Sequence, residues 1–200
     1  MFPALLKGNV KRLFCHSEVC TIPNLLSLFR ILLIPVLYYY CRVRPVIPAA
    51  AGTLVLSCLT DILDGYIARR FRQVSDLGKI LDPLADKLTQ LILLISLIRR
   101  HWAIVPLLVL FCIKEIFQAT LRYLVLRNCG EVHSAEWFGK LSTALLLLVM
   151  GILIVFPDLS DLLASLMILI CAVMLLFAMI RYTALDLSIL KAHSSRKVHV

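Results

Sequence analysis

The sequence lacks the marks of a zinc-binding, repetitive or nucleic-acid-binding protein. Its seven cysteines include no CxxC pair, and Cys15, His16 and Cys20 have no second cluster that would complete a zinc site. It contains no internal repeat and no low-complexity segment. The net charge of +9 is spread along the chain rather than gathered in one patch, so nucleic acid is a poor partner and anionic lipid a better one.

Long apolar runs are what the sequence has in abundance. Hydrophobic residues make up 61% of the chain, and the mean hydropathy is +0.93. A helix needs about 20 apolar residues to cross a bilayer, and a spanning segment must be helical to satisfy its backbone. We therefore predict an all-α integral membrane protein, a bundle of six transmembrane helices. The runs occupy residues 24–41, 46–69, 80–98, 103–126, 141–156 and 162–180.

Residues 1–20 form a separate juxtamembrane segment ahead of the first run. Its apolar residues recur at helical spacing with Lys7, Lys11 and Arg12 between them, which predicts an amphipathic helix lying in the membrane interface. A disordered basic tail is the alternative. No cleavable signal peptide is expected, because the lysines interrupt the early apolar residues. The remaining residues, 21–200, are expected to form one six-helix membrane domain.

The orientation in the membrane is predicted from the basic residues. They precede the first run and follow the second, fourth and sixth, so six spans would place them on one side. Lys and Arg favour the cytoplasmic side of a membrane. The opposite side also carries arginines, at positions 42, 44, 99 and 100, so the bias is incomplete. We expect a protein of the bacterial inner membrane in which these basic residues, and the active site near them, face the cytoplasm.

Four aspartates lie inside two of the apolar runs, where an ionised carboxylate is unfavourable by several kcal/mol. Asp61 and Asp64 are three residues apart, and Asp82 and Asp86 are four apart, so each pair shares a helix face. The link 69–77 is short enough for an antiparallel hairpin that would turn the pairs toward each other. Four carboxylates so placed predict a cage for one or two hard cations, Mg²⁺ or Mn²⁺. Two-metal sites suit in-line displacement at phosphorus.

The residues around the aspartates favour a ligand site over purely structural pairing. Gly65 follows the first pair and Gly78 precedes the second. Glycine lowers helix stability by up to about 1 kcal/mol relative to alanine, and close approach of a ligand or backbone is a reason to keep it. Arg69 offers a planar fork to a phosphate or a carboxylate. A single aspartate paired with Lys87 or Arg69 is the structural alternative, but it does not account for all four.

The segment Asp61-Ile-Leu-Asp64-Gly65-Tyr-Ile-Ala68-Arg69, followed by Gly78, Asp82 and Asp86, resembles the CDP-alcohol phosphotransferase signature with every fixed position filled. The resemblance implies a six-helix membrane fold with a polar cavity open to the cytoplasm, and a homodimer. It implies that Asp61, Asp64 and Asp82 hold metal, with Asp86 as a metal neighbour and the general base. The CDP group would lie against Asp64, Gly65, Ala68, Arg69 and Gly78.

The chemistry of the four carboxylates agrees with that family. An acceptor hydroxyl must lose a proton as it attacks phosphorus, and a carboxylate within reach can take it. Bound metal would spread the pyrophosphate charge and stabilise the departing CMP. We therefore predict metal-dependent transfer of a phosphatidyl group from CDP-diacylglycerol to a hydroxyl acceptor, with Asp82 and Asp86 as the catalytic residues and no further cofactor.

The choice of acceptor depends on three other stretches. Residues 21–30, Lys114-Glu115 with Arg122, and residues 137–143 resemble the phosphatidylglycerophosphate synthase and cardiolipin synthase branch. The sequence departs from that branch at Lys114, where an arginine is expected, and at Leu146, where a glutamine is common. The resemblance favours a phosphorylated small acceptor, sn-glycerol 3-phosphate.

Four basic residues in or beside the apolar runs are the candidates for binding the acceptor phosphate. These are Arg30, Lys114, Arg122 and Lys140. Pairing with a carboxylate is the alternative for the two arginines, and an interfacial anchor is the alternative for Lys140.

Three other functions stay open from the sequence. One is another CDP-alcohol phosphatidyltransferase, with inositol phosphate or an amino alcohol as the less favoured acceptor. Phosphatidylglycerol as acceptor would make the protein a cardiolipin synthase. An ion-coupled transporter is the non-enzyme alternative, but it predicts broken helices in two repeated halves, and the sequence has no such repeat.

Overall fold

The structure is a computed structural model that describes residues 22–71, 78–129 and 137–198. The chain divides into two compact units, with the boundary between Ser96 and Leu97, and each is described by itself. No strand occurs in the part of the chain that the structure describes. The predicted juxtamembrane helix, residues 1–20, lies outside the described residues, and the single membrane domain over residues 21–200 stays a prediction.

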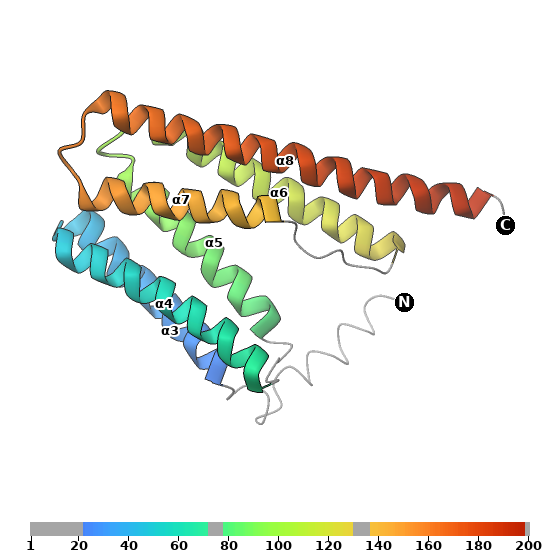
Figure 1. Cartoon of the computed structure of the whole chain (residues 1–200), viewed down its shortest axis with the longest axis horizontal. Coiled ribbons are helices and arrows are strands. Elements are labelled where there is room, and N and C mark those ends of the chain that lie inside the picture. The colour runs from blue at the N-terminus through green and yellow to red at the C-terminus, as the bar shows by residue number, and fades with distance from the viewer. Residues whose placement is uncertain (1–21, 72–77, 130–136, 199–200) are drawn as a thin grey trace. The chain divides into compact units, whose positions relative to one another are not determined.

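The first unit contains α3 (Ile22–Tyr38), α4 (Ile47–Phe71) and α5 (Gly78–Leu97). A five-residue π-helix, η1 (Tyr39–Val43), continues α3 and closes with a bond from the Arg44 amide to the Tyr39 carbonyl at 2.9 Å. A short connection then returns the chain, so α4 packs back along α3 as an antiparallel neighbour (Figure 1). This hairpin brings the beginning of α3 beside the end of α4.

The second unit contains α6 (Ile104–Cys129), α7 (Trp137–Val155) and α8 (Asp161–Val198). Both α6 and α7 pack against α8, the longest of the three (Figure 1). The sequence predicted that the last helix ends near residue 180, where the apolar run stops. It continues to Val198, because residues 181–198 contain neither glycine nor proline to end it.

Five described helices are long and apolar enough to cross a membrane: residues 24–43, 47–67, 104–127, 137–155 and 161–189. Six spans were predicted, and α5 is the helix missing from this set. Asp82, Asp86 and Lys87 give it too much charge for its length. The helices also expose large apolar side chains, among them Ile116 and Leu162. Such outward-facing apolar surface indicates an integral membrane protein.

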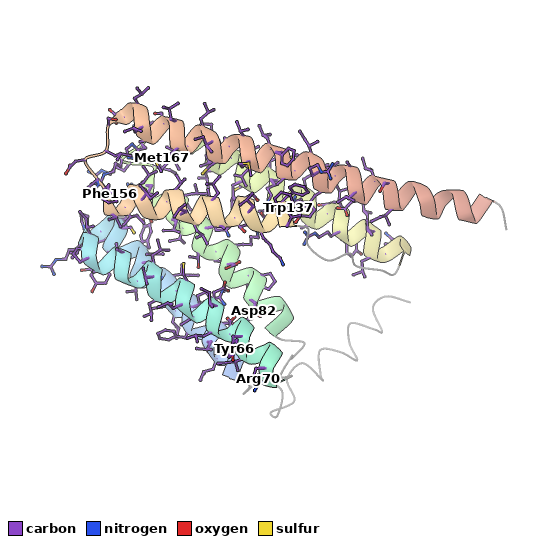
Figure 2. The ribbon with its side chains drawn as sticks, in the orientation of Figure 1. Tyr66, Arg70, Asp82, Trp137, Phe156 and Met167 are labelled. Atoms are coloured by element: carbon purple, nitrogen blue, oxygen red, sulfur yellow. The ribbon has the colours of Figure 1, made fainter. Side chains whose placement is uncertain are left out.

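Aromatic side chains mark the ends of α7. Trp137 begins the helix and Phe156 follows its last residue, and both are exposed (Figure 2). Tryptophan is enriched where a spanning helix meets the membrane–water interface, which fits the position of Trp137. The 19 residues of α7 are close to the roughly 20 that a helix needs to cross the bilayer once.

Candidate active site

One face of α3 carries the polar residues that enter the site. Asn24, Ser27 and Arg30 recur every three residues and are all buried, and the same face continues with the buried Leu37. Spacing of three to four residues puts side chains on one side of a helix. The first half of α3 therefore turns a polar face inward, while its second half turns an apolar one.

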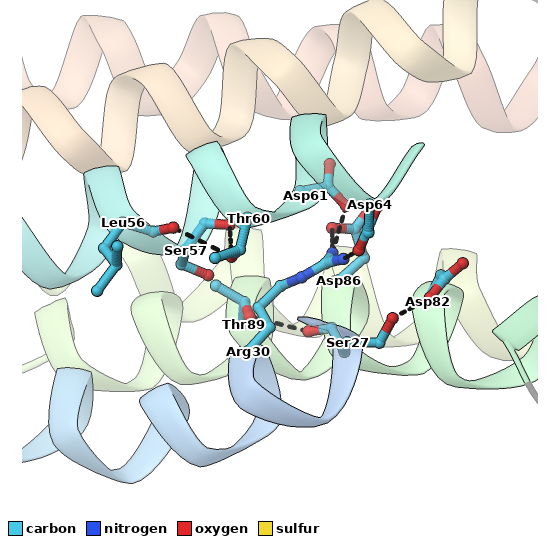
Figure 3. A network of polar contacts seen from close by, with 11 residues as sticks. Ser27, Arg30, Leu56, Ser57, Thr60, Asp61, Asp64, Asp82, Asp86 and Thr89 are labelled. Carbon is cyan, nitrogen blue, oxygen red and sulfur yellow. Dashed lines mark hydrogen bonds and ion pairs between the residues drawn. The ribbon is translucent and has the colours of Figure 1, made fainter. Parts of the chain in front are cut away.

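Arg30 is the centre of the site. Its guanidinium forms ion pairs with Asp61 and Asp64 of α4, and its Nη1 also donates to Oδ1 of Asp86 of α5 at 3.2 Å (Figure 3). The side chain of Arg30 is only 1% exposed. Three helices of the first unit are thus joined at one guanidinium, and the two aspartate pairs predicted to face each other both contribute to it.

Asp82 has a different partner. The hydroxyl of Ser27, one turn before Arg30 on α3, donates a hydrogen bond to Oδ1 of Asp82 (Figure 3). On the facing sides of α3 and α5, Ser27 therefore contacts Asp82, and Arg30 contacts Asp86 one turn further along. The sequence analysis did not single out Ser27, although its spacing from Arg30 is the signal that places it on the same face.

The cluster is unevenly exposed and carries an excess of negative charge. The side chains of Asp61 and Asp86 are 47% and 42% exposed, whereas Asp64 is almost fully buried. Among the side chains that the structure describes, four carboxylates stand against Arg30 and the Lys87 that follows Asp86, so their formal charges sum to −2. Such a site attracts cations from the open side.

The hydroxyl groups behind the cluster are satisfied within their own helices. Thr60 Oγ1 contacts the carbonyls of Leu56 and Ser57 at 3.0 and 2.8 Å, and Thr89 Oγ1 donates to the carbonyl of Ala85 at 2.8 Å (Figure 3). Gln90, one turn after Asp86, is different: it is buried, and neither amide atom has a hydrogen-bond partner. A buried amide left unpaired is unfavourable, by about 1–3 kcal/mol. Gln90 was not among the site residues predicted from the sequence.

The residues predicted to contact CDP are only partly described. Gly65 is half-buried in α4, and the buried Gly78 is the first residue of α5. The side chains of Ala68 and Arg69 lie outside the described residues. Figure 2 shows Tyr66 and Arg70 on the last turns of α4, where this segment ends. The predicted role of these residues in binding CDP stays a prediction.

The other three candidates for the acceptor phosphate belong to the second unit. Lys114 is buried in α6, and its Nζ donates to Oε1 of the neighbouring Glu115 at 2.7 Å. Lys140 lies exposed on the first turns of α7. The guanidinium of Arg122 lies over the ring of Tyr182, 5.4 Å from its centre. Arg30, in the first unit, pairs with carboxylates, which is the alternative considered for it above.

Tyr182 approaches α7 at Gly139, where an added side chain would collide with it. A Cβ added to Gly139 would overlap the Tyr182 hydroxyl and lie 2.8 Å from two carbons of its ring. The carbonyl of Gly139 also accepts from the hydroxyls of Ser142 and Thr143, at 2.9 and 3.1 Å. Gly139 and Tyr182 together hold α7 against α8 beside Arg122. No pattern in the sequence singles out Tyr182.

Comparison with known proteins agrees with the resemblance seen in the sequence. A relative from Haemophilus influenzae, named CDP-diacylglycerol–glycerol-3-phosphate 3-phosphatidyltransferase, is 28% identical over 167 residues, covering 80% of this chain and 90% of its own. A protein of the same name from Escherichia coli K12 is 30% identical, covering 80% and 92%. One from Pseudomonas fluorescens is 39% identical over 106 residues, covering 50% and 54%. The family model for CDP-alcohol phosphatidyltransferase matches residues 20–186, and the chain belongs to that family.

Proposed function

We propose that this protein transfers the phosphatidyl group of CDP-diacylglycerol to sn-glycerol 3-phosphate and releases CMP. The observation that carries the proposal is the meeting of Asp61, Asp64 and Asp86, from two helices, at one buried positive charge inside a membrane protein. The choice of acceptor is supported by the names of the relatives: those aligned over most of their length are called glycerol-3-phosphate phosphatidyltransferases. The family favours this enzyme over an ion-coupled transporter.

The donor set fits a divalent metal ion. All four aspartates offer hard oxygen ligands, which Mg²⁺ and Mn²⁺ prefer. Three already point oxygen atoms at one cation, and the exposed carboxylates of Asp61 and Asp86 give an ion a way in. In the described ranges, no group of three His, Cys, Asp or Glu side chains is arranged to hold a metal ion, and Arg30 pairs with three of the four aspartates. Asp61, Asp64, Asp82 and Asp86 would hold one or two ions, which would supply charge stabilisation to the pyrophosphate.

The roles of the protein's own residues follow from their placement. Asp86 is exposed enough to reach an acceptor hydroxyl, and it would take the proton as the oxygen attacks phosphorus. Asp82, held by Ser27, is kept in place beside it. The backbone at Gly65 and Gly78 would leave room for the CDP group, together with Ala68 and Arg69. Arg30 would bind the acceptor phosphate, and Lys114, Arg122 and Lys140 of the second unit stay candidates for that role from the sequence.

The membrane setting completes the proposal. We infer that α5 is the sixth span, because Asp82 and Asp86 are matched by partners on α3 and need not face lipid. The active site would face the cytoplasm of a bacterial inner membrane, where the basic residues gather. A homodimer is expected for the family.

The test measures CMP release by the purified protein from CDP-diacylglycerol in mixed micelles with Mg²⁺. We expect sn-glycerol 3-phosphate to drive release, and Asp86→Asn to lower the rate by about 10²–10⁴-fold, as loss of a general base does. Asp158→Asn is the matched control, because Asp158 is an exposed aspartate between α7 and α8. Release driven by phosphatidylglycerol alone would make the protein a cardiolipin synthase. No release with either acceptor would refute the enzyme function.

A further inference from the structure

We propose that Arg30 is an internal counter-ion of the metal site: it occupies the carboxylates until a divalent cation enters, and is then released to bind the anionic substrate. The inference rests on the proposed function for the identity of that substrate. It concerns the order of events, metal first and phosphate-bearing ligand second. It also reconciles the two partners considered for Arg30, carboxylates and phosphate.

Arg30 and a metal ion need the same carboxylate oxygens. The guanidinium contacts Oδ1 of Asp61, Oδ2 of Asp64 and Oδ1 of Asp86. A divalent ion coordinated by these oxygens would lie within a few ångströms of the guanidinium, where two positive groups repel each other strongly in a site of low dielectric. Occupation by the two cations is therefore mutually exclusive.

The guanidinium neutralises the cluster incompletely. Arg30 brings one positive charge to three carboxylates, and a divalent ion brings two. Asp82 is held by Ser27 and not by Arg30, so a fourth carboxylate stands ready beside the cluster. The site therefore favours exchange of the guanidinium for a more highly charged ion.

Arg30 leaves one donor unsatisfied where it lies. Arginine has five N–H donors, and its Nε is buried here without a hydrogen-bond partner. A phosphate accepts from Nε and Nη together, in the paired geometry that carboxylates on separate helices do not provide. Release toward a phosphate would satisfy the donor that the carboxylate cluster leaves unpaired.

The consequence is coupling between metal and substrate. If the metal frees Arg30, the phosphate-bearing ligand binds more tightly when metal is present, and by linkage the metal binds more tightly when that ligand is present. The enzyme would then expose its phosphate-binding arginine only when the metal needed for the reaction is in place.

The experiment measures the reactivity of Arg30 in the full chain. The protein in detergent micelles is treated with phenylglyoxal, which modifies accessible guanidinium groups, and the modified peptides are quantified by mass spectrometry. Arg30 is 1% exposed, so modification should be slow without metal. We expect Mg²⁺ or Mn²⁺ to raise its rate at least fivefold, and sn-glycerol 3-phosphate added afterwards to lower it again. The exposed Arg44 is the internal control and should respond neither to metal nor to sn-glycerol 3-phosphate.

Metal binding is followed separately by the loss of the free Mn²⁺ signal in electron paramagnetic resonance. Arg30→Gln removes the competitor, so its Mn²⁺ affinity should rise about tenfold or more; Arg30→Lys, which keeps the charge, should stay near the unaltered protein. Should the variants fail to fold, the labelling of the unaltered protein decides alone. Mn²⁺ that binds without raising the reactivity of Arg30, or that does not bind, overturns the inference. Both readouts need no turnover, so they stand or fall independently of CMP release.

Discussion

Replacing Gly139 with alanine would place a methyl group against the ring of Tyr182. The Cβ would overlap the tyrosine hydroxyl and lie 2.8 Å from Cε2 and Cζ, closer than carbon atoms pack. Overpacking of this kind destabilises a protein by about 1–3 kcal/mol. Because the obstructing atoms are at the end of a side chain, some of the overlap can be relieved by moving Tyr182. That movement would in turn disturb its contact with Arg122.

The matched control is Gly52→Ala. Gly52 is an exposed helical glycine of α4, and a Cβ there would meet nothing within 4 Å. Both substitutions gain helix propensity, up to about 1 kcal/mol, so the difference between them isolates the overlap with Tyr182. We expect Gly139→Ala to be less stable than Gly52→Ala by about 1–3 kcal/mol.

The assay is reversible unfolding in mixed micelles titrated with sodium dodecyl sulfate and followed by circular dichroism. Adding Tyr182→Leu to Gly139→Ala should recover part of the lost stability, because the shorter side chain makes room for the methyl group. If Arg122 binds the acceptor, Gly139→Ala should also raise KM for sn-glycerol 3-phosphate more than it lowers kcat. Equal stabilities for the two alanine variants would refute the packing argument.

Three further predictions concern other parts of the chain. Ser27→Ala removes the donor to Asp82 and should lower the unfolding free energy by about 1 kcal/mol, measured by the same titration; an unchanged value would mean that the bond contributes nothing. Burial lowers the pKa of His101 below its ordinary 6.5; the charge of Arg100 lowers it further, and the charge of Asp161 opposes the shift. As the pH falls, His101 therefore takes up a proton in the unfolded chain before it does so in the folded protein. Stability should therefore fall as the pH drops below about 6.5, and His101→Gln should flatten that dependence; parallel curves would contradict it. A divalent cation at 100 times its Kd should raise the unfolding free energy by about 2.7 kcal/mol, and chelation should reverse this; no shift in Tm would count against a metal site in the folded protein.

The helices were predictable because their cause is local. A run of apolar residues produces a helix wherever the bilayer is the solvent, so α3, α4, α6 and α7 begin and end within a few residues of the predicted spans. The end of α8 was not predictable from hydropathy, which stops at the membrane surface while the helix continues into polar sequence. The charged residues that give α5 its place in the site also keep it out of the set of helices that hydropathy identifies as membrane spans.

The site was predictable only in part, for a similar reason. Spacing within one helix placed Asp61 with Asp64 and Asp82 with Asp86. It could not assign Arg30 its partners, because those partners lie 31 to 56 residues away and the pairing depends on how α3 packs against other helices. The contact of Tyr182 with Gly139 likewise joins two helices far apart in the sequence. Patterns along one helix reveal which residues share a face, but not which face they meet.

The pairing of Arg30 with aspartates on the next helix bears on how this protein enters the membrane as it is synthesised. The ribosome delivers α3 and α4 before α5, and these two helices pack as a hairpin. Arg30 is synthesised before Asp61 and Asp64 and is therefore present when these aspartates reach the translocon. The hairpin can then insert with most of its buried charge compensated. A variant without Arg30 would present two uncompensated carboxylates at that moment, and its defect would appear during insertion, before any substrate is met.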